Sequence, residues 1–475
     1  MNAIVVRELR QAVRSRYVTW MLLFFLGAEC IVAGGVLIGY SFDANANLSA
    51  MAETGRNLFF FLFSVLVMVT MLLVPLYTGI RFASERADDS MDLFFATSLS
   101  PHAVIRGKLI SAGALVLLVF SVCAPFIAMS QYLRGIDWET ILVALCLTFV
   151  SVMMATMGAL FIACLPAGRS VKTMVAIAGL VMLMRFLSPA AVMSSGLFTA
   201  SRAAQGVVSM PRYLQLLGVL ASYAGIFVML YVFAVSLLMP PMANRALVTR
   251  GTCGVLWLLW GGVVMLDRYL SGTVSSSRGD AWYVVSMGCW TAWLCIAMLE
   301  DDRVSNRIRR FIPRVPVVRL VAPLLCSGPA TGLCFAMLMA ALTSVVNGIP
   351  AYDIWGTLNA LFLYTLGALL TAHLLWRFLM PTMHRMAIIA GATLLLGILS
   401  LLPLLWAVCT SIDVSPCHWS VFSVYALMYG YVHQVNPGIH VVAGGLWAGI
   451  MLVLHLPWFR RELGKYKPLE RRTAP

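Results

Sequence analysis

Long uninterrupted stretches of apolar residues dominate the chain. They run for about 20 residues at a time and lack the alternation of apolar and polar positions that barrel strands would show. Backbone polar groups in lipid need internal partners, which a helix supplies. The pattern therefore predicts an all-α, polytopic membrane protein with about twelve transmembrane helices. We expect the spans at 17–40, 57–80, 109–133, 139–165, 173–193, 213–239, 252–270, 281–299, 321–346, 354–376, 387–410 and 438–458.

These spans form two sets of six, joined at Pro240-Pro241. We therefore predict a first domain over 1–240 and a second helical membrane region over 241–475. In both sets the longest inside loop follows the second helix, at 81–108 and at 300–320. This spacing suggests an internal duplication. The two loop sequences hardly match, so it stays open whether the second region is a degenerate repeat or an unrelated extension.

Composition and charge fit a membrane protein and set its orientation. Hydrophobic residues make up 61% of the 475 positions and charged residues 11%, whereas soluble domains carry about 25% charged residues. With the N-terminus inside, 26 of the 33 lysines and arginines fall in inside segments and 6 in outside segments. Positive charge concentrates on the cytoplasmic side of membrane proteins. We therefore expect both termini in the cytoplasm, and the net charge of +14 does not indicate a nucleic-acid partner.

The segment before the first span predicts a basic amphipathic helix. Residues 2–16 place apolar side chains near one helical face, and most of the charged ones fall elsewhere. Such a helix is suited to the membrane interface. The apolar residues are Ile4, Val5, Leu9, Ala12 and Val13, and the charged ones are Arg7, Glu8, Arg10, Arg14 and Arg16.

The segment 81–108 is long for a loop between spans and is not polar throughout. Asp89 or Ser90 is suited to cap a short helix, and Ser100-Pro101 is suited to end it. A second short helix is expected from His102 to Lys108. The first helix would carry an apolar face formed by Met91, Phe94, Phe95 and Leu99. An amphipathic helix on a cytoplasmic loop rests on lipid or in the groove of a partner protein.

In these two segments the chain resembles the type 2 ABC exporter permeases. Those proteins have an elbow helix with a Glu-Leu-Arg core, which corresponds to Glu8-Leu9-Arg10, and a conserved pattern between the second and third spans. Ser90, Met91 and Asp92 replace the family's Thr, Leu and Glu, whereas Asp89 and Ser98 replace its Gly and Pro. The residues that match the pattern are Glu85, Arg86, Leu93, Thr97, Leu99, Ser100, Pro101, Gly107 and Lys108.

The resemblance implies that 81–108 is a coupling loop that docks into an ATPase subunit. No Walker motif occurs in the sequence, so the ATPase would be a separate chain that binds ATP and Mg²⁺. This chain would hold no cofactor, metal or catalytic residue. The resemblance also implies the bacterial inner membrane, and leaves open a second permease chain or a homodimer. It is specific over 1–240 and looser beyond. The expected coupling residues are Glu85, Arg86, Asp92, Thr97, Ser100, Pro101 and Lys108.

Two alternative functions remain. Glu29 and Arg185 lie about halfway along their spans, and such charges usually face a partner or a watery cavity. They could pair with each other or serve an ion-coupled secondary transporter without an ATPase. A membrane enzyme acting on lipids or glycans would need polar groups at one face. Only the outer region 411–440 offers such groups. Its potential metal ligands are Asp413, Cys417, His418, His433 and His440, and their spacings match no standard metal site.

Overall fold

A computed structural model of the whole chain gives the positions of most of its residues. Contacts between residues divide it into two compact units, Met1–Pro240 and Pro241–Pro475, and each unit is described by itself. The structure describes residues 3–41, 48–87, 100–132, 136, 138–165, 212–239, 243–271, 277–300, 322–347, 354–379, 385–410, 423–425, 427 and 437–466.

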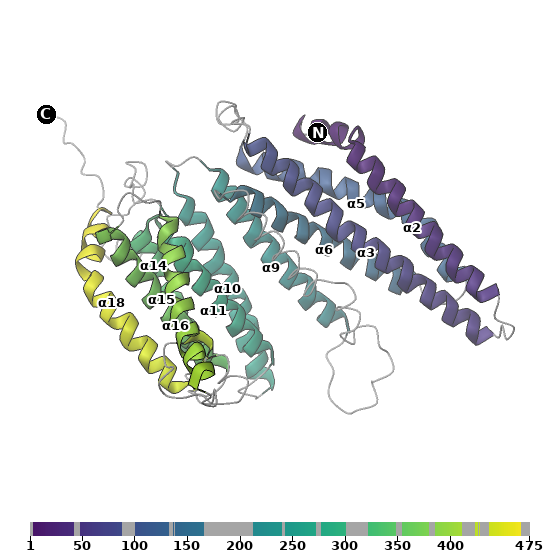
Figure 1. Cartoon of the computed structure of the whole chain (residues 1–475). Coiled ribbons are helices and arrows are strands. Elements are labelled where there is room, and N and C mark those ends of the chain that lie inside the picture. Colours follow the sequence, from purple (N-terminus) through teal and green to yellow (C-terminus); the bar gives the residue numbers. More distant parts are fainter. Residues whose placement is uncertain are drawn as a thin grey trace. The chain divides into compact units, whose positions relative to one another are not determined.

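The first unit is a bundle of long helices (Figure 1). Helix α3 lies at its centre and packs against α2, α5 and α6, and α6 packs in turn against α9. Helices α3 and α6 approach each other closely at Gly79. A Cβ at this position would lie 3.2 Å from the Cβ of Ala159 in α6, so a small residue is needed there. The helices are α1 (Ala3–Val13), α2 (Arg16–Ser41), α3 (Leu48–Ala87), α5 (Pro101–Tyr132), α6 (Trp138–Cys164) and α9 (Arg212–Leu238).

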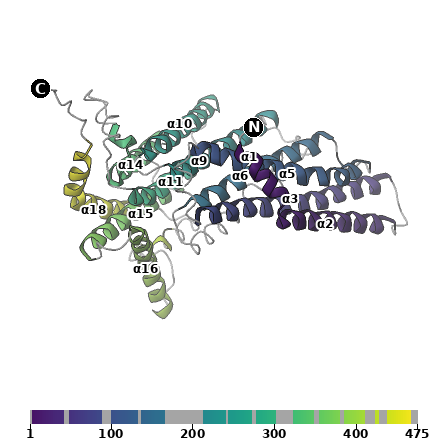
Figure 2. The ribbon, with the colours of Figure 1, turned by 90° about the horizontal axis from the view of Figure 1, so that it is seen from above.

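The short helix α1 lies across the ends of the long helices and contacts α5 and α2 (Figures 1 and 2). Val5 and Glu8 are buried on its inner side, whereas Arg7 and Arg10 are exposed. The amphipathic helix expected before the first span is therefore present. Its inner face nevertheless includes an acidic residue that the sequence analysis grouped with the outward charges.

The second unit repeats the order of helix contacts seen in the first. Helix α11 packs against α14 and α15, and α15 packs against α18, as α3 packs against α5 and α6, and α6 against α9. The helices are α10 (Arg245–Ser271), α11 (Ser277–Leu299), α14 (Pro329–Asn347), α15 (Ile354–Leu379), α16 (Met386–Thr410) and α18 (Gly438–Gly464), with a 3₁₀ helix η3 (Ala322–Leu325) before α14.

Two glycines permit close approaches between helices of this unit. A Cβ on Gly332 of α14 would lie 2.6 Å from the Cβ of Ala297 in α11, and one on Gly367 of α15 would lie 2.8 Å from the indole of Trp447 in α18. Both distances are too short for a real side chain. These two positions therefore set how closely α11 and α14, and α15 and α18, pack together.

Nine of the described helices are long and apolar enough to cross a membrane: α2, α3, α5, α6, α10, α11, α14, α15 and α18. In α9 and α16 the described apolar stretches are shorter, Tyr223–Leu238 and Ala387–Leu401. Large apolar side chains such as Phe24, Ile31 and Met68 are more than half exposed on these helices, as lipid contact requires. The prediction of a polytopic helical membrane protein is therefore confirmed.

The expected number of twelve spans stays a prediction. Each expected span except 173–193 coincides with a helix, and 173–193 lies outside the residues that the structure describes. Several helices extend beyond the expected spans, such as α3, which begins at Leu48, and α5, which begins at Pro101, whereas one begins later than expected. The span expected at 321–346 begins as η3, and the long helix α14 starts only at Pro329, because proline is favoured in the first turn of a helix, where its missing N–H costs nothing.

A charge cluster joining α1, α3 and α5

Most of the expected coupling residues whose positions are described lie on helices. Helix α3 continues through Arg81 and Glu85 to Ala87, so that Glu85 and Arg86 lie on its last turns. Helix α5 begins at Pro101 and carries Lys108 without a break. The separate short helix expected over 102–108 is therefore the first part of α5. Asp92 and Thr97 lie outside the described residues.

Ser100 explains why α5 begins where it does. The Ala103 backbone N–H donates to the Ser100 Oγ over 3.3 Å, which is the contact of an N-cap residue. Pro101 follows as the first helical residue. These two expected coupling residues thus fix the start of α5 and with it the position of Lys108, two turns further along.

Lys108 lies between two carboxylates from different helices. Its Nζ donates to Glu8 Oε1 of α1 over 3.1 Å and to Glu85 Oε2 of α3 over 2.7 Å. The side chain is 6% exposed, and its ammonium lies 4.9 Å from the ring centroid of Phe82. One lysine thus joins α1 to the end of α3.

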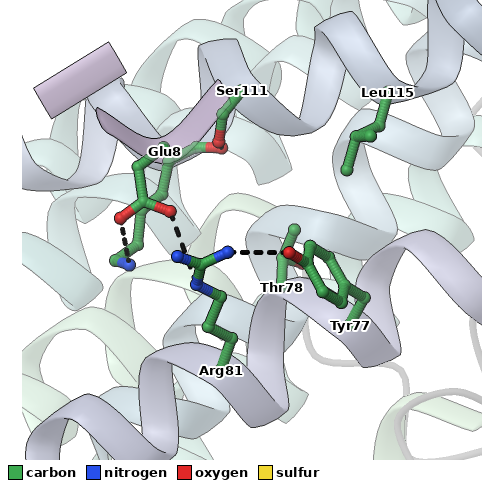
Figure 3. A pocket seen from close by; sticks show the side chains of 7 residues that line it. Glu8, Tyr77, Thr78, Arg81, Ser111 and Leu115 are labelled. Carbon is green, nitrogen blue, oxygen red and sulfur yellow. Dashed lines mark hydrogen bonds and ion pairs between the residues drawn. The ribbon is translucent and has the colours of Figure 1, made fainter. Parts of the chain in front are cut away.

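Arg81 adds the second positive charge. Its Nε lies 3.8 Å from Glu8 Oε2 and 3.5 Å from Glu85 Oε1. Its guanidinium also donates to the Tyr77 hydroxyl over 2.7 Å and to the Gln11 side chain of α1. Figure 3 shows Arg81 between Glu8 and Tyr77, beside a small cavity lined also by Thr78, Ser111 and Leu115.

We call Glu8, Arg81, Glu85 and Lys108 the α1–α3–α5 charge cluster. It holds two acids and two bases, so its formal charges cancel. Balanced pairing of this kind offsets the cost of removing each ion from water. The cluster therefore holds α1 to α3 and α5, the two helices that flank the 88–99 segment.

A second polar contact, absent from the sequence-based expectations, ties α5 to α9. The Tyr231 hydroxyl of α9 lies 3.0 Å from His102 Nδ1 and accepts a hydrogen bond from Arg106 Nε over 3.2 Å. His102 and Arg106 are four residues apart, which is the helical spacing for one face. That spacing is visible in the sequence, but the tyrosine that it meets lies 125 residues beyond Arg106.

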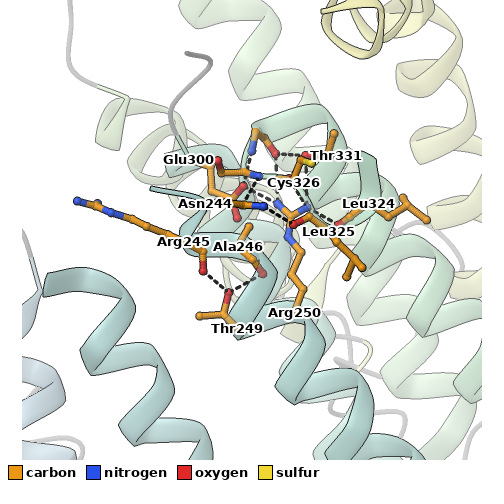
Figure 4. Close-up of polar contacts among 12 residues, drawn as sticks. Asn244, Arg245, Ala246, Thr249, Arg250, Glu300, Leu324, Leu325, Cys326 and Thr331 are labelled. Carbon is orange, nitrogen blue, oxygen red and sulfur yellow. Dashed lines mark hydrogen bonds and ion pairs between the residues drawn. The ribbon is translucent and has the colours of Figure 1, made fainter. Parts of the chain in front are cut away.

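The second unit has its own buried charge at the corresponding end of its helices. Arg250 of α10 has no exposed side-chain surface, and its guanidinium donates to Glu300 Oε2 over 2.5 Å, just beyond the end of α11 (Figure 4). Glu300 also accepts a hydrogen bond from the Gly328 N–H over 2.6 Å. An acid at the end of α11 thus binds a base, as Glu85 does at the end of α3.

Arg250 also satisfies backbone groups in the turn before α14. It donates to the carbonyl oxygens of Leu324 and Cys326 over 2.6 and 2.8 Å. Tyr466, beyond α18, donates to the Ser327 carbonyl over 2.6 Å. Burial raises the pKa of the Tyr466 hydroxyl, which keeps it protonated as a donor. Buried carbonyls without such partners would be costly.

Comparison with protein-family models, curated proteins and solved structures gave no match. The geometry of the described residues and the resemblance in the sequence are therefore the basis of the function proposed below.

Of the two charged residues expected within the membrane, the structure describes only Glu29. Glu29 is fully buried in α2, where its Oε1 accepts a hydrogen bond from the Cys123 thiol of α5 over 3.7 Å. Arg185 lies outside the described residues, so a pair between the two stays a prediction.

The polar residues of the outer region 411–440 are described only in part. Asp413, Cys417, His418 and His433 lie outside the part of the chain with described positions. His440 lies on α18 with its Nδ1 2.8 Å from the Tyr364 hydroxyl of α15. Within the described residues no group of three or more metal-ligating side chains comes together.

Proposed function

We propose that this chain is the membrane-spanning permease subunit of an ATP-driven ABC exporter. A separate ATPase subunit would bind ATP and Mg²⁺ and would dock on the segment between α3 and α5. The protein would lie in the bacterial inner membrane, with about twelve spans and both termini in the cytoplasm. No catalytic residue is assigned to this chain.

The observation that carries the proposal is the α1–α3–α5 charge cluster. Glu8, Glu85 and Lys108 all belong to the positions that resemble the exporter family, yet they lie up to 100 residues apart in the sequence. A chance resemblance would give no reason for these three side chains to bind one another. Their meeting supports a functional unit of elbow helix, loop and flanking helices.

The cluster also suggests how movement of the loop would reach the membrane. α3 and α5 enter the loop as continuous helices, and the ion pairs hold their ends together and to α1. A displacement of the docked segment would therefore move all three helices as one body. This would change the packing of α3 against α6 and of α5 against α9.

The second unit fits the proposal as a degenerate repeat of the first. The shared order of helix contacts and the acid at the end of α11 support this relation. A chain with both units would form a translocation unit by itself. A second permease chain or a homodimer is the competing arrangement, which the mass of the purified complex distinguishes.

The docking surface is tested by reversing one charge in the loop. Glu85 is unsuitable because its reversal would also break the ion pair with Lys108, so we choose Asp92→Arg. The matched control is Glu53→Arg, an exposed acid at the other end of α3. Each variant is purified from its native membrane in a mild detergent, and the co-purifying proteins are identified.

We expect a soluble-type protein with Walker motifs to co-purify with wild type and with Glu53→Arg. The amount that co-purifies with Asp92→Arg should be at least about tenfold lower, because reversing one charge at a docking contact costs on the order of 1.4 kcal/mol or more. Equal recovery with all three proteins would remove Asp92 from the docking surface. Recovery of no ATPase with any of them would contradict the exporter proposal.

The competing function is an ion-coupled secondary transporter, and the buried Glu29 favours it. Transport in that case would survive depletion of ATP and stop when the ion gradient is collapsed. An exporter would show the opposite dependence.

A further inference from the structure

Glu29 lies deep within the membrane-spanning part of α2. The span runs from Arg16 to Val36, and at a rise of about 1.5 Å per residue Glu29 lies roughly 20 Å from its start. Its side chain is fully buried in the first unit. Along α3, the charged residues closest to those that pack beside Glu29 are Glu53 and Arg56, which are more than half exposed and form an ion pair with each other over 3.9 Å.

The helix face that carries Glu29 is apolar on both sides of it. Phe25 and Ala33 are one turn before and one turn after Glu29, and so share its face. Phe25 belongs to a buried cluster with Phe59 and Phe63 of α3 and several residues of α5. Ala33 belongs to another buried cluster with Leu58 and Leu62 of α3. The carboxyl group thus lies between two apolar clusters.

The polar contacts of Glu29 are too few for a charged group. Oε1 accepts one hydrogen bond, from the Cys123 thiol over 3.7 Å, and Oε2 has no hydrogen-bond partner. Within the described ranges, no ion pair includes Glu29, and the Cys123 thiol is the titratable group that touches it. An ionised carboxylate in such a place would cost several kcal/mol, and a protonated one far less.

We propose that Glu29 is a proton-binding site within the membrane. The carboxyl group carries a proton while α2 packs against α3 and α5. It releases the proton when α2 separates from α5 and water reaches Oε2. Proton binding is thereby linked to the packing of α2. The proposal goes beyond the exporter function and does not depend on the ATPase partner.

Infrared spectroscopy and unfolding measurements test the site together. The carbonyl stretch of a protonated carboxylic acid should appear in wild type at neutral pH and be missing from Glu29→Gln. Glu53→Gln, at an exposed acid of α3, should keep the band. A neutral carboxyl group that ionises on unfolding makes the folded state less stable as pH rises. The thermal midpoint of wild type should therefore fall at high pH relative to that of Glu29→Gln.

A different result would overturn the site. If Glu29 were ionised and paired with Arg185, the band would be absent from wild type and Glu29→Gln would lower the midpoint at every pH. The double variant Glu29→Gln/Arg185→Gln would then recover much of that loss. A band that persists in Glu29→Gln would also contradict the proposal, because it would belong to another acid.

Discussion

Replacement of Lys108 with methionine should lower the free energy of unfolding of the protein by about 3 kcal/mol, because truncating one partner of a buried ion pair leaves an uncompensated charge. Lys108 is paired with both Glu8 and Glu85, and the variant leaves these two carboxylates without their shared lysine. The loss of unfolding free energy should lie at the low end of the range for variants that remove one partner of a buried ion pair, because Arg81 stays within 4 Å of both acids. Denaturant unfolding of the purified protein in detergent measures it.

The matched control is Lys465→Met. Lys465 also pairs with an acid, Glu462 at 2.7 Å, but its side chain is 39% exposed. An exposed ion pair of this kind contributes only about 0–1 kcal/mol. If Lys108→Met cost no more than Lys465→Met, the α1–α3–α5 charge cluster would not hold the three helices together.

Replacement of Arg250 with methionine should have a larger effect, about 5 kcal/mol, at the upper end for a buried ion pair. The guanidinium is fully buried and binds Glu300 and the carbonyls of Leu324 and Cys326. No second base is paired with the Glu300 carboxylate among the described residues, so the variant leaves this acid with the Gly328 N–H but no cation. It also removes the donor to the Leu324 carbonyl and one of the two donors to the Cys326 carbonyl. The same unfolding measurement applies.

Arg461→Met serves as its control, because Arg461 is exposed near the end of α18 in the same unit. Surface substitutions of this kind usually change stability by less than about 0.5 kcal/mol. A loss in Arg250→Met that is no greater than in Arg461→Met would show that the Arg250 contacts do not stabilise the second unit.

The membrane helices were predictable because lipid imposes one simple rule. Every apolar run of about 20 residues has to be a helix, and the described helices follow the expected spans. The start of α14 was missed because Pro323, Ser327 and Gly328 interrupt a run that remains apolar overall. The mean hydropathy of the run stays high across these residues, although the regular helix begins only after them.

The candidate site was only partly predictable. Glu8 was grouped with outward charges, although its spacing from Val5 puts it on the buried face of α1. Whether such a residue turns inward depends on a base from another helix, here Lys108, which local spacing cannot identify. The role of Arg81 was missed for the same reason. Arg250 was counted only as inside positive charge, and its partners lie 50 and more residues away.

The proposed exporter function requires the segment between α3 and α5 to contact an ATPase. This contact can be captured by placing the photo-cross-linker p-benzoylphenylalanine at Phe95, within that segment. The control position is Phe61, which is 58% exposed on α3 within the membrane span. On illumination in native membranes, we predict an adduct with a protein that contains Walker motifs from position 95, and only lipid adducts from position 61. Lipid adducts alone from both positions would contradict the proposed contact, because they would mean that the segment rests on the membrane.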